Sequence, residues 1–114
     1  MNLIKAAKEN NLEKVKKILK EKNLEINKVD SDNYSALLYA QENDNYEMCE
    51  LLLKAGIDQN IQESDCKNSV FLFAFKDSDD PNFIKLLLKH GANPNIQDVS
   101  GSTALMIECT KDFS

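Results

Sequence analysis

One pattern of residues recurs along this chain with a step of 34 positions, and this recurrence limits the possible folds more than any other feature. Each copy has an apolar residue at one position and, in the first three copies, alanine three residues later: Leu3, Leu37, Phe71 and Leu105, then Ala6, Ala40 and Ala74, with Glu108 in the fourth place. A unit of this size is too small to enclose its own core. The copies are therefore expected to stack and to bury a continuous strip of apolar side chains.

The second copy, residues 35–60, shows the pattern most completely. Leu37 and Leu38 lie within one helical turn after Ser35, whose hydroxyl can accept a hydrogen bond from a free backbone N–H group of that turn. A second, longer helix is predicted from apolar residues that surround most of its axis: Tyr46, Met48, Cys49, Leu51, Leu52 and Leu53. Gly56 suits the left-handed conformation that ends such a helix.

Capping residues and insertions vary between the copies. Ser69 and Thr103 repeat the hydroxyl of Ser35, whereas Met1 stands at that place in the first copy. We place one extra residue in each of three loops, which tolerate insertion: residues 22–26, 63–68 and 77–82. The second of these loops has no glycine for the left-handed residue of a tight turn, so Asn68 or a looser turn is expected to serve.

The motifs of these copies resemble the ankyrin repeat family. The second copy reads Asp30-x-x-Asn33-x-Ser35-Ala36-Leu37-x-x-Ala40 and then Leu52-Leu53-x-x-Gly56-x-Asp58-x-Asn60; the third ends in Leu87-Leu88-x-x-Gly91-x-Asn93-x-Asn95, and the fourth begins Asp98-x-x-Gly101-x-Thr103-Ala104-Leu105. The resemblance implies an all-α solenoid of stacked helix-turn-helix units with extended finger loops. It covers residues 1–114 as a single domain, with repeats at about 1–29, 30–62 and 63–97 and a partial repeat at 98–114.

One departure from the family concerns its Thr-Pro-Leu-His tetrapeptide, which is nowhere intact. The proline position holds Ala36, Val70 and Ala104, and the histidine position holds Ile4, Leu38, Leu72 and Met106. The hydrogen bonds that this histidine makes between neighbouring repeats in the family are therefore absent. We expect apolar packing to hold the copies together instead.

Composition excludes several classes of function. The net charge is −5 and every basic residue is lysine, so the chain lacks the arginine fork that recognises phosphate and guanine, and nucleic-acid binding is not expected. No apolar run approaches the roughly 18 residues of a membrane span, and the N-terminus lacks a secretory apolar core. Three cysteines at irregular spacing indicate a reducing compartment, so we expect a cytoplasmic protein.

The sequence contains no constellation typical of catalysis. HExxH, GxGxxG, P-loop and CxxC motifs are all missing, and His90, the only histidine, follows a predicted helix where it can interact with the helix dipole. We therefore expect no enzymatic activity, no cofactor and no metal site.

A protein-binding surface remains. In the ankyrin family the fingers and first helices line a concave face that recognises proteins. The matching candidates in this chain are Ser31, Asp32, Tyr34, Glu42, Asn43, Ser64, Asp65, Lys67, Lys76, Asp77, Ser100 and Ser102. Tyr34 is the expected anchor, because an aromatic side chain with a polar tip on a loop is the kind most enriched at binding hot spots.

The expected function is a non-catalytic protein–protein interaction module. Acidic candidates outnumber basic ones, so a basic or mixed protein partner is predicted. The alternative is a structural N-terminal portion of a larger ankyrin-repeat protein whose activity lies elsewhere. We expect a monomer unless the C-terminal end of the stack is exposed. Resemblance to the family also makes Asn60 a candidate for asparagine hydroxylation, because Leu52 and Asp58 precede it at the family's spacing; the competing interpretation is that Asn60 only braces its loop.

Overall fold

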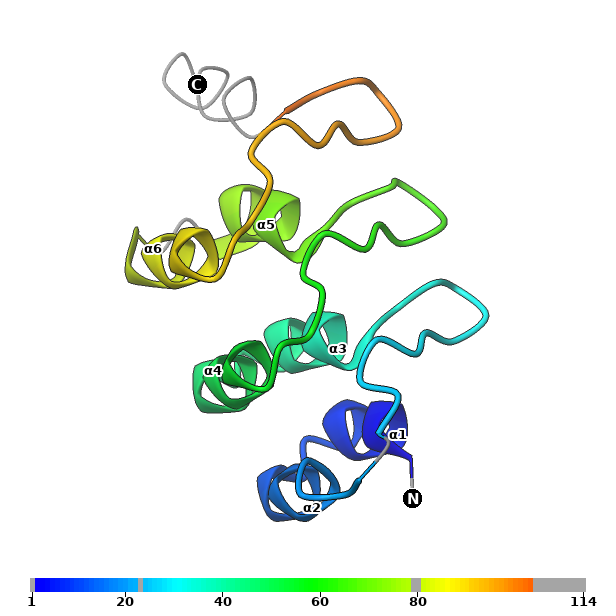
Figure 1. The fold of residues 1–114 in the computed structure, drawn as a ribbon. Coiled ribbons are helices and arrows are strands. Elements are labelled where there is room, and N and C mark those ends of the chain that lie inside the picture. The colour runs from blue at the N-terminus through cyan, green and yellow to red at the C-terminus, as the bar shows by residue number, and fades with distance from the viewer. Residues whose placement is uncertain (1, 23, 79–80, 104–114) are drawn as a thin grey trace. The chain divides into compact units, whose positions relative to one another are not determined.

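The computed structural model describes residues 2–22, 24–78 and 81–103, and within these ranges every regular element is helical (Figure 1). The elements, in chain order, are α1 (Leu3–Lys8), α2 (Leu12–Ile18), α3 (Ala36–Glu42), α4 (Tyr46–Lys54), α5 (Val70–Phe73), the π-helical turn η1 (Ala74–Ser78) and α6 (Pro81–Lys89). The chain is therefore all-α, as predicted. The expected helix of the fourth copy, with Leu105, Glu108 and Cys109, lies outside the described residues.

The first compact unit, Met1–Asp58, contains two helix pairs. Each of its helices is capped by a side chain whose oxygen accepts a first-turn N–H: Asn2, Asn11, Ser35 and Asn45. The cap of α1 is thus Asn2. The 34-residue step back from Ser35 placed the capping position at Met1, one residue too early. α3 packs against α1, and α4 against α2. Side chains between them, among them Leu37, Leu38 and Leu52, have no exposed surface.

Asparagine side chains join the two helix pairs of this unit. The Nδ2 group of Asn43 donates to the carbonyl oxygen of Ala7 at 3.0 Å, and that of Asn45 donates to Oδ1 of Asn10 at 2.9 Å. The backbone N–H of Asp58 donates to Oδ1 of Asn27 at 2.6 Å. Apolar packing therefore does not act alone, contrary to our expectation: amides supply the hydrogen bonds between copies that the missing histidine does not.

The second compact unit, Gln59–Ser114, contains α5, η1 and α6. The hydroxyl of Ser69 accepts from the N–H of Leu72 at 3.3 Å and so begins α5 as predicted. The π-helical turn takes up an added residue inside the helix, since such a turn widens the backbone by one residue. The insertion that the spacing assigned to a loop over 77–82 therefore begins earlier, in a helical segment. Phe83 and Leu87 of α6 are buried.

Candidate protein-binding site

Each of the three fingers, residues 30–35, 63–69 and 98–103, is closed by the carboxylate of its first residue. Oδ1 of Asp30 accepts from the N–H groups of Asp32 and Tyr34 at 2.9 and 3.0 Å. Oδ1 of Asp98 accepts in the same way from Ser100 and Ser102, both at 2.9 Å. The carboxylate of a half-buried aspartate therefore sets the path of each of these two loops, and its hydrogen bonds within the loop leave it less available to a partner.

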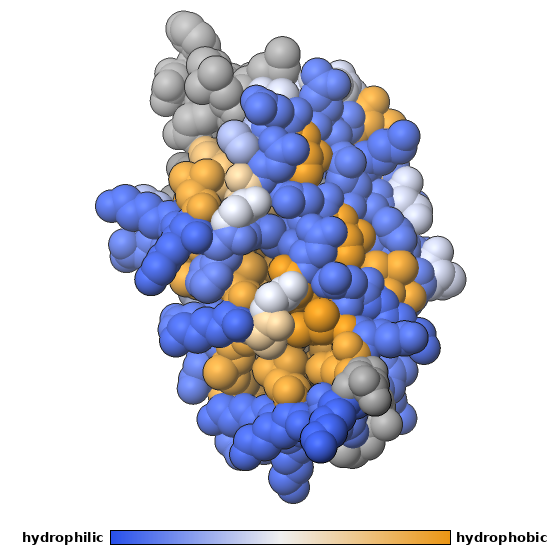
Figure 2. Space-filling model, viewed as in Figure 1, coloured by the Kyte–Doolittle hydropathy of each residue, from blue (hydrophilic) through white to orange (hydrophobic). Residues whose placement is uncertain are grey.

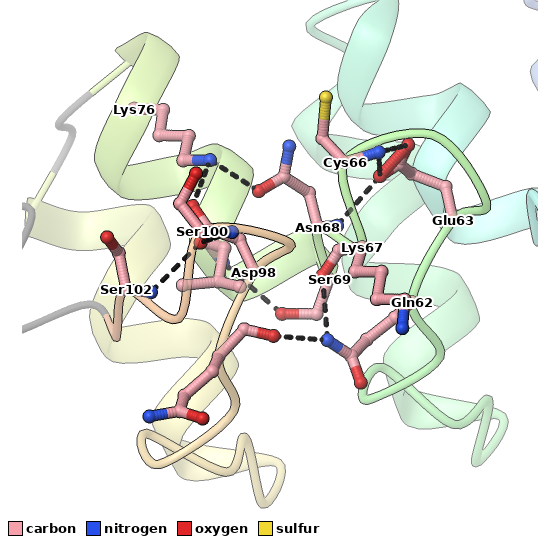
Figure 3. A network of polar contacts seen from close by, with 12 residues as sticks. Gln62, Glu63, Cys66, Lys67, Asn68, Ser69, Lys76, Asp98, Ser100 and Ser102 are labelled. Carbon is pink, nitrogen blue, oxygen red and sulfur yellow. Dashed lines mark hydrogen bonds and ion pairs between the residues drawn. The ribbon is translucent and has the colours of Figure 1, made fainter.

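The middle finger uses glutamate in the same role. Glu63, only 3% exposed, accepts from the N–H groups of Cys66 and Asn68, with the latter at 2.7 Å (Figure 3). The longer side chain spans the extra residue of this finger. The left-handed residue is Lys67, with φ of 56°, at the place of Asn33 and Gly101 in the other fingers. Of the two expectations for this turn, Asn68 or a looser turn, the first is wrong: Asn68 is buried and its N–H is held by Glu63, so its neighbour makes the turn.

Two tyrosines form an aromatic pair at the base of the first finger. The rings of Tyr34 and Tyr39 lie 5.0 Å apart between centroids with 41° between their planes. The hydroxyl of Tyr39 donates to Oδ2 of Asp30, and the ammonium group of Lys8 lies 5.6 Å from the centroid of the Tyr39 ring. The first finger, α3 and α1 thus meet at Tyr39, and the ring of Tyr34 packs against the ring of Tyr39.

Electrostatics at this pair follow from those contacts. Burial alone would raise the pKa of the Asp30 carboxyl, but the hydrogen bonds from Tyr39, Tyr34 and Asp32, with the charge of Lys8, hold it below its usual range. The same hydrogen bond to Asp30 is the main cause that raises the pKa of the Tyr39 hydroxyl, with burial second. Asp30 therefore stays charged and Tyr39 stays protonated near neutral pH, which preserves their contact.

In the second unit, Lys76 joins two fingers. Its Nζ donates to Oδ1 of Asn68 at 2.7 Å and to Oδ2 of Asp98 at 2.8 Å (Figure 3). The hydrogen bond from Lys76, and after it the one from the N–H of Ser102, hold the pKa of the Asp98 carboxyl below its usual range. Gln62 adds a second link, since its Nε2 donates to the carbonyl oxygens of Lys67 and Gln97 at 2.7 and 2.6 Å.

The structure places the predicted site residues in two groups. Those exposed to solvent are Ser31, Asp32, Glu42, Asn43, Ser64, Asp65, Lys67 and Ser100. Those that are half-buried are Tyr34, Lys76 and Ser102. Asp77 belongs to η1 by its backbone, and its side chain lies outside what the structure describes. Of these residues, Lys76 and Asn43 hold the protein together through the contacts given above.

Sequence reasoning missed Tyr39 as part of the site. It stands in the middle of α3, where a helical pattern alone gives it no role. Two features of the sequence could have indicated Tyr39. The other copies have Lys5 and Phe73 at the same position, and Asp30, its hydrogen-bond partner, stands nine residues earlier.

The candidate for modification, Asn60, accepts a hydrogen bond at Oδ1 from the N–H of Asn93 at 2.9 Å. Asn27 makes the corresponding contact with Asp58 in the first unit. These contacts favour the bracing role for Asn60. Its hydroxylation stays a prediction, and the amide would have to leave this contact to enter an enzyme.

Chemically reactive groups are few in the described part of the chain. Residues 2–22, 24–78 and 81–103 hold no group of three His, Cys, Asp or Glu side chains arranged to bind a metal ion. Burial raises the pKa of the Cys49 thiol to about 12, whereas Cys66 is an exposed free thiol. Of the helices the structure describes, none has the length and apolar character to cross a membrane.

Comparisons with known proteins agree with this architecture. A family model described as ankyrin repeats (3 copies) matches residues 2–63, and a model of a single ankyrin repeat matches residues 72–99. The crystal structure of an ankyrin repeat domain from Acinetobacter baumannii AYE is similar, with a TM-score of 0.84 and 27% sequence identity over 97% of this chain. The chain spans 55% of the length of that structure. A search of curated proteins found no match to this chain. The chain belongs to the ankyrin repeat family, whose members are generally protein-interaction modules.

Proposed function

We propose that this chain is a non-catalytic protein-binding module whose main contact is the Tyr34 surface, defined as Ser31, Asp32, Tyr34, Tyr39 and Glu42. The observation that carries the proposal is the aromatic pair, in which the ring of Tyr34 lies 5.0 Å from that of Tyr39 between centroids, with the two planes tilted by 41°. Binding costs less entropy when the anchoring side chain is already immobile. A half-buried tyrosine held on a loop is the kind of residue that dominates binding energies at interfaces.

Charge on this surface favours a basic or mixed partner. Asp32 and Glu42 are exposed, and both lie near enough to raise the pKa of Tyr39 through their negative charge. Asp30 is also near but is occupied by its hydrogen bonds. Exposed charges of one sign mainly speed the encounter with a partner of the other sign, while the aromatic pair slows dissociation. The lack of arginine continues to argue against nucleic acid.

A quantitative pull-down from a lysate of the source organism tests the proposal. Wild-type protein, Tyr34→Ala and Tyr34→Phe are immobilised, and bound proteins are identified by mass spectrometry. We expect at least one protein that binds the wild type and Tyr34→Phe but is depleted with Tyr34→Ala. Lys17→Ala on the exposed side of α2 is the matched control and should retain that protein. Equal capture by all variants would contradict the proposed surface.

The alternative function, a structural portion of a larger ankyrin-repeat protein, has one specific observation in its favour. Leu88 of α6 is 48% exposed, whereas Leu53, at the corresponding position of α4, is 4% exposed. Analytical ultracentrifugation separates the two proposals. A monomer at all concentrations supports the self-sufficient module, and association that Leu88→Lys abolishes supports the portion of a larger stack.

A reducing cytoplasm is the proposed location. Cys66 is a free thiol on an exposed finger, and Cys49 is free and buried. An exposed free thiol is more typical of reducing than of oxidising compartments.

A further inference from the structure

We propose that Lys8 of α1 is a positioning residue for the Tyr34 surface: it holds the ring of Tyr39, against which Tyr34 packs, and acts on binding through that ring. This inference rests on the proposed function, because it names what keeps that site in its binding conformation. The ammonium group of Lys8 lies 5.6 Å from the centroid of the Tyr39 ring. A cation within about 6 Å of a ring centroid is attracted to the face of the ring. A residue of copy one therefore steadies an aromatic pair that belongs to copy two.

The charge of Lys8 also acts on the acceptor of the Tyr39 hydroxyl. That hydroxyl donates to Oδ2 of Asp30. Burial raises the pKa of the Asp30 carboxyl, and the charge of Lys8 is among the causes, with three hydrogen bonds, that lower it. Lys8 thus favours the charged form of Asp30, which accepts a hydrogen bond more strongly than the neutral form. One ammonium group therefore supports both the ring of Tyr39 and the hydrogen bond of its hydroxyl.

In the last finger, a lysine at the same place in the repeat acts on its finger directly. Lys76 stands two steps of 34 residues after Lys8, and Asp98 stands the same distance after Asp30. Oδ1 of Asp98 accepts from N–H groups of its own finger, as Oδ1 of Asp30 does. Oδ2 of Asp98 lies 2.8 Å from Nζ of Lys76. In the first finger the Tyr39 hydroxyl takes that second oxygen, and Lys8 lies over the tyrosine ring. Both lysines therefore act on the aspartate that begins the following finger, one directly and the other through a tyrosine.

The middle copy shows that a lysine at this place is not a general requirement of the repeat. Glu42 stands there, one step of 34 residues after Lys8. The finger that follows Glu42 begins with Glu63, and both carboxylate oxygens of Glu63 accept from N–H groups of its own finger. In this chain the lysine thus precedes the two fingers that begin with aspartate and is replaced before the one that begins with glutamate. This correlation favours a role for Lys8 in holding the finger rather than in stacking the helices.

The expected effect on binding is modest because the contact is open to water. Lys8 is exposed, and Figure 2 shows many hydrophilic residues on the drawn face. Cation–π contacts at such sites are weak. Without Lys8, the rings of Tyr39 and Tyr34 must lose more freedom when a partner binds, and this ordering weakens the complex. We therefore expect loss of the Lys8 charge to raise the dissociation rate by about threefold.

NMR of the free protein tests whether Lys8 positions the pair. Lys8→Gln removes the charge, Lys8→Arg keeps a cation, and Lys5→Gln makes the first change at an exposed lysine one turn earlier on α1. We expect Lys8→Gln to shift the ring resonances of Tyr39 and to raise the pKa of Asp30. Lys8→Arg and Lys5→Gln should match the wild type in both. Unchanged ring resonances and an unchanged pKa of Asp30 in Lys8→Gln would overturn the proposal.

Binding kinetics test whether this positioning matters to a partner, and the probe is the protein that the Tyr34-dependent pull-down identifies. Lys8→Gln should raise its dissociation rate by about threefold relative to Lys5→Gln, with an equal association rate and salt dependence, and Lys8→Arg should restore the wild-type rate. An unchanged dissociation rate would overturn the proposal. An association rate or salt dependence that changes in Lys8→Gln but not in Lys5→Gln would make Lys8 a direct contact and would also overturn it. Capture of no Tyr34-dependent protein would refute the proposed function instead, and the NMR comparison would then decide alone whether Lys8 positions the pair.

Discussion

Replacing Tyr39 by phenylalanine tests how the aromatic pair is fixed. The change removes the hydroxyl that donates to Asp30 and leaves the ring between Tyr34 and Lys8. A hydrogen bond to a charged group contributes about 1.5–3 kcal/mol to stability. Asp30 and Tyr39 are both half-buried, so water weakens the interaction, and we expect Tyr39→Phe to lower the free energy of unfolding by about 1 kcal/mol at pH 7.

The pH dependence of this loss has a definite sign. The pKa of Asp30 is lowered in the folded protein, so its charged form stabilises the fold above the unfolded value of about 3.9, and this stability is lost as the pH falls through the folded pKa. Tyr39→Phe should therefore differ from the wild type at pH 7 and differ less at pH 3. Urea unfolding at both pH values measures this difference.

Carboxyl titration by NMR supplies the direct readout and an internal control. In Tyr39→Phe the pKa of Asp30 should move up toward its usual range, because a hydrogen bond to the charged form is gone. The pKa of Asp98, which Lys76 holds down, should not change. An unchanged pKa of Asp30 together with unchanged stability would refute the account of this contact.

Two further predictions concern the core and the thiols. Leu52→Ala removes a side chain with no exposed surface and should lower the free energy of unfolding by about 2–5 kcal/mol, whereas Leu88→Ala, at a side chain 48% exposed, should cost about 1 kcal/mol or less by chemical denaturation. A loss below about 1 kcal/mol at Leu52 would contradict the repeat register. Cys66 should react with a maleimide within minutes in the folded protein, while Cys49, buried and with its pKa raised to about 12, should react only on unfolding. Peptide mapping by mass spectrometry checks both thiols, and early labelling of Cys49 would contradict its burial.

The helices of the repeat were predictable from sequence because local physics determines them. The hydroxyls of Ser35 and Ser69 cap α3 and α5, Leu52 is buried, and Gly56 has a positive φ of 92°. Each of these features follows from the hydrophobic periodicity of a helix, a capping residue at its start or a glycine at its end, all of which neighbouring residues determine. The resemblance to the ankyrin repeat was also readable in the sequence, and the family models confirm it.

Contacts made across the fold were not predictable in the same way. Lys67 adopts the left-handed conformation because Glu63 holds the N–H of Asn68, five residues away. The side chain of Tyr39 meets Asp30 only once the finger folds back on α3. A lysine in a positive-φ position contradicts its own preference, so no local rule selects it. The order of residues in a finger therefore gives its length but not the contacts that shape it.

Dissociation of the identified partner from the Tyr34 surface is the most direct test of the central claim. Association and dissociation rates are measured at two salt concentrations for the wild type, Tyr34→Ala, the double variant Asp32→Lys with Glu42→Lys, and Lys17→Ala. We predict that Tyr34→Ala raises the dissociation rate by a factor that corresponds to a loss of about 2 kcal/mol of binding free energy. The double lysine variant should slow association and reduce its dependence on salt. If both leave the rates unchanged while Lys17→Ala alters them, the partner binds elsewhere and the account is contradicted.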